Sequence, residues 1–250
     1  RRDRIALAYT ERPFMKLAIF DLDGTLTESK QPLTGEMAAL IARLLDRVPV
    51  AVISGGALPQ FLTQVVERLP KFTHLKNLYL LPTSGAALYE FHNDTWQKVY
   101  EERISERDGA AIKKTIEDGA RESGVIDFGA QTWGPRIEYR GGQVTFSALG
   151  QQAPIAEKKK WDPDYTKRRR LQAAIAKHLP KGFMGAMGGA TTIDVTKEGV
   201  DKAYGIHKLC ERLSISESDV LYTGDELQKH GNDEAVYKTE VQTKAVKNPA

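Results

Sequence analysis

A short apolar run that ends in two aspartates constrains this chain more than any other feature. Residues 17–20 predict a buried strand, and Asp21 and Asp23 follow it with Gly24 next. Alternate side chains of a strand point to one side, and glycine allows a sharp turn away from the strand end. Open α/β sheets bind ligands at the carboxyl ends of their strands. Two carboxylates there repel each other by about 4 kcal/mol at ~4 Å and an effective dielectric of ~20. A divalent cation removes that repulsion, and Mg²⁺ is the usual one beside phosphate.

Short apolar runs alternate with helical patterns toward both ends of the chain. Residues 48–53, 78–81 and 220–223 predict further buried strands, with apolar residues at helical spacing between them. This alternation is typical of a doubly wound, parallel-sheet α/β core. Residues 86–198 contain helices and runs that alternate like antiparallel strands, with a hairpin turn expected at residues 92–94. One helix is expected to open at Asp162 and Pro163, with Asp as N-cap and Pro in the first turn. The sequence therefore predicts an α+β insertion within the core.

We expect a discontinuous core with a separate inserted domain. Residues 15–85 and 199–250 form the Rossmann-like core, and residues 86–198 form the insertion. Residues 1–14 are expected to be an N-terminal extension, because Met15 stands directly before the first strand. The chain lacks the final helix that such cores often have, so we expect a clipped end.

The composition is that of an ordinary globular protein. Hydrophobic residues make up 41% and charged residues 28%, with a formal net charge of +3. This balance gives no general attraction to nucleic acid or to a membrane surface. No apolar run reaches the length that spans a bilayer, and the lone Cys210 fits a reducing cytoplasm.

Residues 151–181 carry nine Lys or Arg against three Asp or Glu. A solvated helix face is the simpler interpretation, and a nucleic-acid or protein-binding module is the alternative.

The segment from Phe20 to Thr27 resembles the nucleophile motif DxDGT of the haloacid dehalogenase superfamily. The resemblance implies that Asp21 attacks a phosphoryl group and forms an aspartyl-phosphate. It implies that Asp23 is the general acid and base. Thr25 would hold the transferring phosphate or the position of Asp23. An acidic corner without chemistry is the alternative interpretation.

Two later segments resemble the second and third motifs of the superfamily. Ser54 ends a predicted strand, where the family keeps a hydroxyl that binds phosphate. Gly55 and Gly56 leave backbone N–H groups open to an anion. Lys202 opens a predicted helix, where the family's lysine pairs with the nucleophile and the phosphoryl oxygens. A plain glycine turn and a solvated lysine are the alternatives.

The end of the chain resembles the fourth motif, which binds the metal. Asp225 follows a predicted strand, and Asn232 and Asp233 come soon after it. The resemblance implies that Asp225 binds Mg²⁺ together with Asp21 and the backbone carbonyl of Asp23. Asn232 and Asp233 would be further ligands or residues that orient the ligands.

The insertion lies between the second and third motifs, which resembles subfamily IIB of the superfamily, the class with a C2-type cap. Within that class the chain resembles the eukaryotic-type phosphomannomutases, in residues 137–142, 188–195, 201–202 and 230–233. The resemblance implies that the substrate is a small phosphate ester, most simply a sugar phosphate. It also implies that caps can pair and form a homodimer.

The cap departs from this family where arginines grip the distal sugar phosphate. The matching places carry Trp133, Val144 and Gln151, and Lys30 stands where the mutase has an arginine. Charge-assisted contacts are worth about 1.5–3 kcal/mol each, so a mutase without several of them would hold a bisphosphate weakly. We therefore expect a phosphohydrolase that acts through an aspartyl-phosphate, with a sugar phosphomutase as the alternative.

The remaining candidate substrate-binding residues also lie in the predicted cap. Arg136 and Arg140 lie near the replaced arginines. Thr192 and Asp194 occupy places that the family uses to meet substrate hydroxyls or phosphate. The neutral side chain of Gln151 suits an unphosphorylated part of a sugar.

Overall fold

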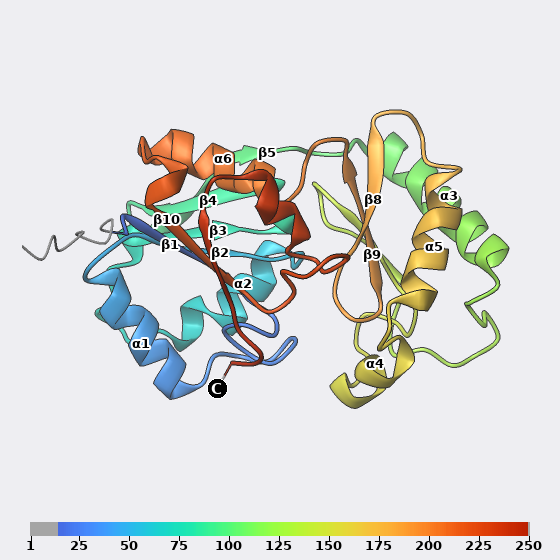
Figure 1. The fold of residues 1–250 in the computed structure, drawn as a ribbon, viewed down its shortest axis with the longest axis horizontal. Coiled ribbons are helices and arrows are strands. Elements are labelled where there is room, and N and C mark those ends of the chain that lie inside the picture. Colours follow the sequence, from blue (N-terminus) through green and yellow to red (C-terminus); the bar gives the residue numbers. More distant parts are fainter. Residues whose placement is uncertain (1–14, 250) are drawn as a thin grey trace, which may run out of the picture.

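The computed structural model describes residues 15–249 and consists of two lobes side by side (Figure 1). The expected extension, residues 1–14, lies outside the described residues. The larger lobe is built on a seven-stranded sheet and the smaller lobe on a four-stranded sheet. Among the described helices, none combines the length and the apolar character needed to cross a bilayer.

The larger sheet has the strand order β11-β10-β1-β2-β3-β4-β5. Its parallel strands are β11 (Gln242–Ala245), β10 (Val220–Gly224), β1 (Leu17–Asp21), β2 (Val50–Ile53) and β3 (Leu78–Leu81). Its antiparallel strands are β4 (Ala87–His92) and β5 (Thr95–Glu101). The carboxyl ends of β1, β2 and β10 therefore lie next to one another at one edge.

Helices cover both faces of this sheet, which confirms the predicted doubly wound α/β core. They are α1 (Gly35–Leu45) and α2 (Leu58–Gln64) on one face and α6 (Lys202–Leu213) on the other. The alternation along β2 shows how the faces are filled. Val50 and Val52 pack with α1 and α2, whereas Ala51 and Ile53 pack with α6. A strand that is covered on both sides is apolar throughout, as its sequence is.

The smaller sheet is antiparallel, with the strand order β6-β7-β9-β8. Its strands are β6 (Ile137–Tyr139), β7 (Val144–Ser147), β9 (Thr192–Lys197) and β8 (Phe183–Met187). The helices of this lobe are α3 (Glu106–Ser123), α4 (Ile155–Trp161) and α5 (Thr166–Ala176). Phe146 and Val195 join the apolar cluster that α3 and α5 cover. The alternate residues Thr145 and Asp194 face the opposite way, toward the larger lobe. The second sheet thus has one apolar and one polar face.

Short 3₁₀ turns connect these elements. They are η1 (Val66–Arg68), η2 (Leu75–Asn77), η3 (Thr83–Gly85), η4 (Glu217–Asp219) and η5 (Glu234–Lys238).

The boundary of the insertion differs from the one we expected. We assigned residues 86–198 to the cap, but β4 and β5 extend the larger sheet. β4 turns back antiparallel beside β3, with Leu80 opposite Tyr89, and a tight turn at Asn93 and Asp94 leads into β5. The alternating pattern predicted this hairpin correctly. It could not say which sheet the hairpin joins, because antiparallel edge strands occur in both kinds of sheet.

The helix that we expected to open at Asp162 begins later. α5 starts at Thr166, and Asp162 is buried before it. The Asp162 carboxylate accepts hydrogen bonds from the backbone N–H groups of Lys167 at 2.8 Å and Arg168 at 3.0 Å. It also accepts one from Nε of Arg168 at 2.9 Å. Asp162 therefore still caps the first turn of the helix. It does so across an intervening turn in which Tyr165 has a positive φ of 63°.

A glycine-to-glycine contact between α6 and the turn η3 gives a stability prediction. A Cβ on Gly205 would lie 2.7 Å from the Cα of Gly85, whereas a Cβ on Gly35 in α1 would meet nothing within 4 Å. Alanine normally stabilises a helix by about 0.5–1 kcal/mol relative to glycine. Overpacking costs about 1–3 kcal/mol, so Gly205→Ala should lower the free energy of unfolding. Chemical denaturation should show the opposite sign, or no change, for the control Gly35→Ala. Stabilisation by Gly205→Ala would contradict the packing described.

Candidate functional site

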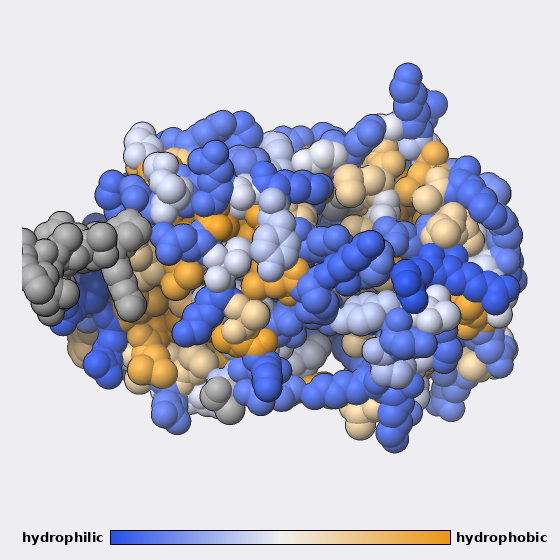
Figure 2. Space-filling view, in the orientation of Figure 1, coloured by the Kyte–Doolittle hydropathy of each residue, from blue (hydrophilic) through white to orange (hydrophobic). Residues whose placement is uncertain are grey.

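A cavity of about 740 Å³ lies between the two lobes. The larger lobe lines it with the loops after β1, β2 and β10 and with the first turn of α6. The smaller lobe lines it with the polar face of its sheet. The visible face of the molecule is hollowed between the lobes, with many hydrophilic side chains around the hollow (Figure 2). The sequence therefore brings its polar strand ends and its polar sheet face to one place.

The ammonium of Lys202 is the centre of the cavity floor. Lys202 is the first residue of α6, whose N-cap is Asp201, and its side chain is 3% exposed. Its Nζ donates to Oδ1 of Asp21 at 2.6 Å, to Oδ1 of Asp233 at 2.5 Å and to Oδ1 of Asn232 at 3.0 Å. Burial alone would lower the pKa of this amine, but the two carboxylates outweigh burial and raise it. Lys202 is therefore charged and binds three acceptors.

Three carboxylates surround this single cation. One oxygen from each of Asp21, Asp225 and Asp233 lies within 4.8 Å of the others. Burial raises the pKa of Asp21 well above its ordinary value, with Lys202 opposing the shift and the other two carboxylates adding to it. Burial also raises the pKa of Asp225. One ammonium cannot neutralise the buried carboxylates of Asp21 and Asp233 together with the half-buried one of Asp225, so the ionised cluster carries excess negative charge.

The three carboxylates of the cluster differ in how many hydrogen bonds they accept. Both oxygens of Asp233 are occupied, Oδ1 by Lys202 and by the hydroxyl of Tyr222 at 2.5 Å, and Oδ2 by the N–H of Glu226 at 3.2 Å. Oδ2 of Asp21 is buried and has no hydrogen-bond partner. Asp225 receives one hydrogen bond, from the Thr25 hydroxyl to Oδ1 at 3.0 Å.

This donor set fits a hard divalent cation such as Mg²⁺, which prefers carboxylate oxygens. Asp21 and Asp225 are the side chains that would hold it, and the loop at Gly24 passes so close that a Cβ there would lie 2.3 Å from Oδ2 of Asp225. Asn232 and Asp233, which we expected as metal ligands or as residues that orient them, both accept hydrogen bonds from Lys202. Their place in the structure therefore favours the orienting role.

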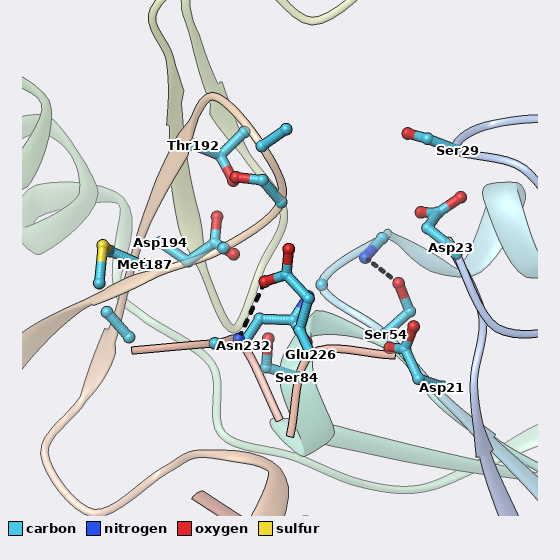
Figure 3. A pocket seen from close by; sticks show the side chains of 18 of the residues that line it. Asp21, Asp23, Ser29, Ser54, Ser84, Met187, Thr192, Asp194, Glu226 and Asn232 are labelled. Carbon is cyan, nitrogen blue, oxygen red and sulfur yellow. Dashed lines mark hydrogen bonds between the residues drawn. The ribbon is translucent and has the colours of Figure 1, made fainter. Parts of the chain in front are cut away.

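In the close view the carboxylate of Asp23 lies above Asp21 and points away from it, toward Ser29 (Figure 3). It accepts a hydrogen bond from the backbone N–H of Lys30 at 2.6 Å. It also accepts from the side-chain amides of Gln60 at 3.0 Å and Gln64 at 3.4 Å. The second aspartate thus lies in the cavity within a shell of N–H donors.

The loop after β2 forms the wall beside Asp21 and joins the two lobes. The hydroxyl of Ser54 accepts from the N–H of Gly56 at 3.3 Å, as the dashed line in Figure 3 marks. The carbonyl of Gly55 accepts from Nη1 of Arg140 at 2.6 Å and from Nε2 of Gln143 at 3.2 Å. The predicted phosphate loop therefore lies in the cavity and also holds the smaller lobe.

Four cationic side chains line the cavity on the side of the smaller lobe. They are Lys30, Arg140, Lys158 and Lys159, and the exposed Lys159 pairs with Glu28. Burial lowers the pKa of Lys30 to about 8, with the positive charges of Lys158 and Arg140 adding to the effect. Burial also lowers the pKa of Lys158. Nζ of Lys30 donates to the backbone carbonyl of Gln151, which links the two lobes.

Arg140 is largely committed to protein partners. It bonds Oε2 of Glu138 through Nε at 3.0 Å and Nη2 at 2.7 Å, and Oε1 of Gln151 at 3.1 Å. With the bond to Gly55, most of its five N–H donors are occupied. Lys30 and Lys158 therefore carry most of the unpaired positive charge of this cluster.

The polar face of β9 brings the other predicted cap residues into the cavity. Asp194 is buried, its Oδ1 has no hydrogen-bond partner, and burial raises its pKa against the opposing charge of Arg140. Thr192 lies at the opposite side of the cavity from Asp21 in the close view (Figure 3). Asp194 therefore offers an unpaired acceptor to a bound molecule.

Two predicted residues have different places from those we expected. Arg136 does not line the cavity, because Nη2 donates to the carbonyl of Asp127 at 2.6 Å and Nε to that of Ala148 at 3.2 Å. Thr25 orients Asp225, rather than Asp23 or a phosphate. A sequence pattern does not reveal which way a loop side chain points.

Four residues that contribute to the site were missed by the sequence analysis. They are Gln60, Gln64, Lys158 and Tyr222. The glutamines are four residues apart on α2, a spacing that places them on one helix face. Lys158 lies in a run of three lysines, which gave no signal to separate it from its exposed neighbours.

Comparison with known proteins agrees with this geometry. A family model described as "Eukaryotic phosphomannomutase" matches residues 37–250. The chain is 24% identical over 229 residues to a phosphomannomutase of Spinacia oleracea, covering 90% of this chain and 87% of the relative. It is 25% identical over 238 residues to the phosphomannomutase of Saccharomyces cerevisiae, covering 93% and 89%.

Solved structures share the fold. The N-terminally truncated, IMP-bound IMP-nucleotidase of Plasmodium falciparum matches with a TM-score of 0.67 at 18% identity over 94% of this chain. This chain spans only 65% of that protein. A haloacid dehalogenase-like hydrolase of Bacteroides thetaiotaomicron matches with a TM-score of 0.56 at 15% identity, covering 84% of this chain and 81% of the other. With the family model extending over most of its length, the chain belongs to the eukaryotic phosphomannomutase family and has the haloacid dehalogenase fold.

Proposed function

We propose that this chain is a Mg²⁺-dependent phosphotransferase that forms an aspartyl-phosphate on Asp21, and that it interconverts sugar phosphates as a phosphomutase. One observation carries the proposal. Asp21 presents a buried, unpartnered oxygen beside Lys202 on the floor of a cavity whose other side holds the cationic pair Lys30 and Lys158. Such a cavity suits a substrate with a reacting phosphate at one end and a second phosphate at the other.

In the proposed reaction each residue of the site has a separate role. One carboxylate oxygen of Asp21 attacks phosphorus, and the bond from phosphorus to the sugar oxygen breaks. Asp23 gives its proton to the departing oxygen and later takes one from the hydroxyl that attacks the aspartyl-phosphate. Lys202 and the hydroxyl of Ser54 offset the charge that develops on the phosphoryl oxygens. When bound by Asp21 and Asp225, Mg²⁺ would neutralise phosphate charge and keep the reacting oxygens aligned.

The cationic pair favours the mutase. A mutase must hold a sugar bisphosphate in two orientations, so it needs a strong distal anion site. We expected hydrolysis because Gln151 and other residues replace cap arginines. Lys158 reaches the cavity from α4 and, with Lys30, supplies positive charge there, whereas nothing in the sequence indicated that Lys158 would lie in the cavity. The family match also supports the mutase.

Hydrolysis is the second candidate, on the basis of Arg140. Its hydrogen bonds to Glu138, Gly55 and Gln151 leave few of its N–H donors for a substrate. A distal site of two lysines recognises phosphate as point charges and not in the bidentate manner of arginine. Cytoplasmic location, pairing through the cap and the lack of a nucleic-acid partner stay predictions.

Replacing the nucleophile should separate these candidates. Asp21→Asn should abolish phosphoryl transfer, because an amide oxygen is a poor nucleophile. The wild-type chain should convert a hexose 1-phosphate into the 6-phosphate, stimulated by a catalytic amount of hexose bisphosphate, with little free phosphate. Product analysis that finds only free phosphate would favour the hydrolase. Full activity of Asp21→Asn would contradict both, and Asp94→Asn, in the exposed β4–β5 turn, is the control.

Removing one carboxylate should remove Mg²⁺ binding. Mg²⁺ should raise the melting temperature of the wild-type chain but not of Asp225→Asn, as thermal scans with and without the ion would measure. A carboxyl group must be ionised to bind a cation, and the pKa of both Asp21 and Asp225 is raised. The Mg²⁺ affinity should therefore start to fall at a higher pH than for ordinary carboxylates as the solution is acidified. An equal Mg²⁺ response in both proteins would place the ion elsewhere.

Removing the buried cap lysine should weaken the distal anion site. Lys158→Met should weaken binding of a hexose bisphosphate roughly 10- to 100-fold, the equivalent of one charge-assisted contact. Turnover of an aryl phosphate, which has no second anion, should stay within about twofold. The matched control is Lys160→Met on the same helix, where the side chain is exposed and pairs with Glu157. Equal losses for both substrates would exclude a distal role for Lys158.

A further inference from the structure

The carboxylate of Asp23 is surrounded by hydrogen-bond donors only. Oδ1 accepts from the backbone N–H of Lys30 and from Nε2 of Gln64, and Oδ2 accepts from Nε2 of Gln60. Both amides come from α2, at positions four residues apart, so one helix face holds the carboxylate. Among the described residues no side-chain cation forms an ion pair with it, so neutral amides and a backbone N–H set its position.

Of the two glutamines, Gln64 is the one whose side-chain orientation is fixed by a second hydrogen bond. It is 4% exposed, and Nε2 also donates to the backbone carbonyl of Gln31 at 2.6 Å. A carbonyl accepts only from the nitrogen of the amide, so this bond determines which way the amide faces. Nε2 is therefore held toward Asp23, at the longer distance of 3.4 Å.

Gln60 is the glutamine that lines the cavity, beside the phosphate loop. Its side chain passes so near the phosphate loop that a Cβ on Gly56 would lie 2.5 Å from its Oε1. Its Nε2 makes the shorter contact with Asp23, at 3.0 Å. Gln60 is only partly buried and lines the cavity, so it can be replaced with little disturbance of the core.

We propose that Gln60 and Gln64 are positioning residues that hold Asp23 for proton transfer to and from the sugar oxygen. This inference rests on the proposed function, in which Asp23 is the acid and base. In the forward step the oxygen of Asp21 bonds to phosphorus, the bond from phosphorus to the sugar oxygen breaks, and the proton of Asp23 goes to that oxygen. Donors from α2 select the rotamer of Asp23 from which this transfer is made.

The test uses the dependence of rate on the leaving group. A hexose phosphate releases a strongly basic alkoxide that needs a proton, whereas p-nitrophenyl phosphate releases a stable phenolate that does not. Gln60→Leu should lower kcat for the hexose phosphate roughly 10-fold, part of the 10²–10⁴-fold that acid–base catalysis supplies, with KM nearly unchanged. In the first turnover, before the aspartyl-phosphate is broken down, release of p-nitrophenolate should stay within about twofold of the wild-type rate. A purely structural defect would slow both substrates alike.

A double-mutant cycle tests whether the effect acts through Asp23. Added to Asp23→Asn, Gln60→Leu should cause no further loss with the hexose phosphate. Gln64→Leu should repeat the leaving-group effect, and if its loss of the bond to Gln31 prevents folding, Gln60→Leu decides alone. The matched control is Thr63→Ala, on the exposed side of the same helix, where the hydroxyl bonds only backbone carbonyls.

Failure of the inference and failure of the proposed function give different results. Labelling of the wild-type chain with acetyl phosphate reports aspartyl-phosphate formation directly. No label on the wild-type chain would overturn the proposed function and the inference with it. A labelled wild-type chain in which Gln60→Leu slows both substrates equally, or neither, or in which the two substitutions add, would overturn the positioning role alone.

Discussion

The buried ammonium of Lys202 is the interaction on which the site depends. It begins α6 and binds Asp21 at the end of β1 and Asp233 in the loop after β10, residues that are 181 and 31 positions away. Leaving one member of a buried ion pair without its partner costs about 3–5 kcal/mol. These three segments therefore have to converge when the core folds. The convergence nevertheless leaves the carboxylates in excess, because Asp225 joins the same cluster. The charge that one lysine does not neutralise is the charge that suits a divalent cation, so the same cluster organises the fold and prepares the chemistry.

The position of the smaller lobe depends on the loop that lines the reacting end of the cavity. The peptide at Gly55 offers its carbonyl to Arg140 and Gln143, while the neighbouring Ser54 lies beside Asp21. The turn between β6 and β7 is pressed against the core, since a Cβ on Gly142 would lie 2.7 Å from the Cβ of Ala86. The lobe that supplies the cationic pair and Asp194 is thus attached beside the phosphate loop. This attachment sets the span between the two ends of the cavity, and that span decides whether a substrate with two phosphates fits.

Much of the larger lobe could be predicted from local pattern. The apolar run before Asp21, the helix that opens at Lys202 and the strand before Asp225 each have a period or a cap that one segment reveals by itself. The sequence could not predict which sheet contains β4 and β5, because a hairpin has the same alternating pattern in either sheet. The start of α5 was misplaced because Asp162 caps it from across a turn and not from the adjacent position. In both cases the deciding contact joins residues that the local pattern treats as separate.

The sequence by itself determined the fold class and the chemical identity of the reacting groups. DxDGT, the glycine loop and the final acidic loop follow parallel strands, which bring their carboxyl ends together whatever the details of packing. The lysine opens the helix that packs on the same sheet. Only the tertiary structure decided which of those groups are free. It engaged Asp233 and Asn232 with Lys202, turned Thr25 to Asp225 and Arg136 out of the cavity, and brought in Lys158, Gln60 and Gln64. The physical reason is that hydrogen bonding and burial depend on the direction of a side chain in three dimensions, and residue type and spacing do not encode that direction.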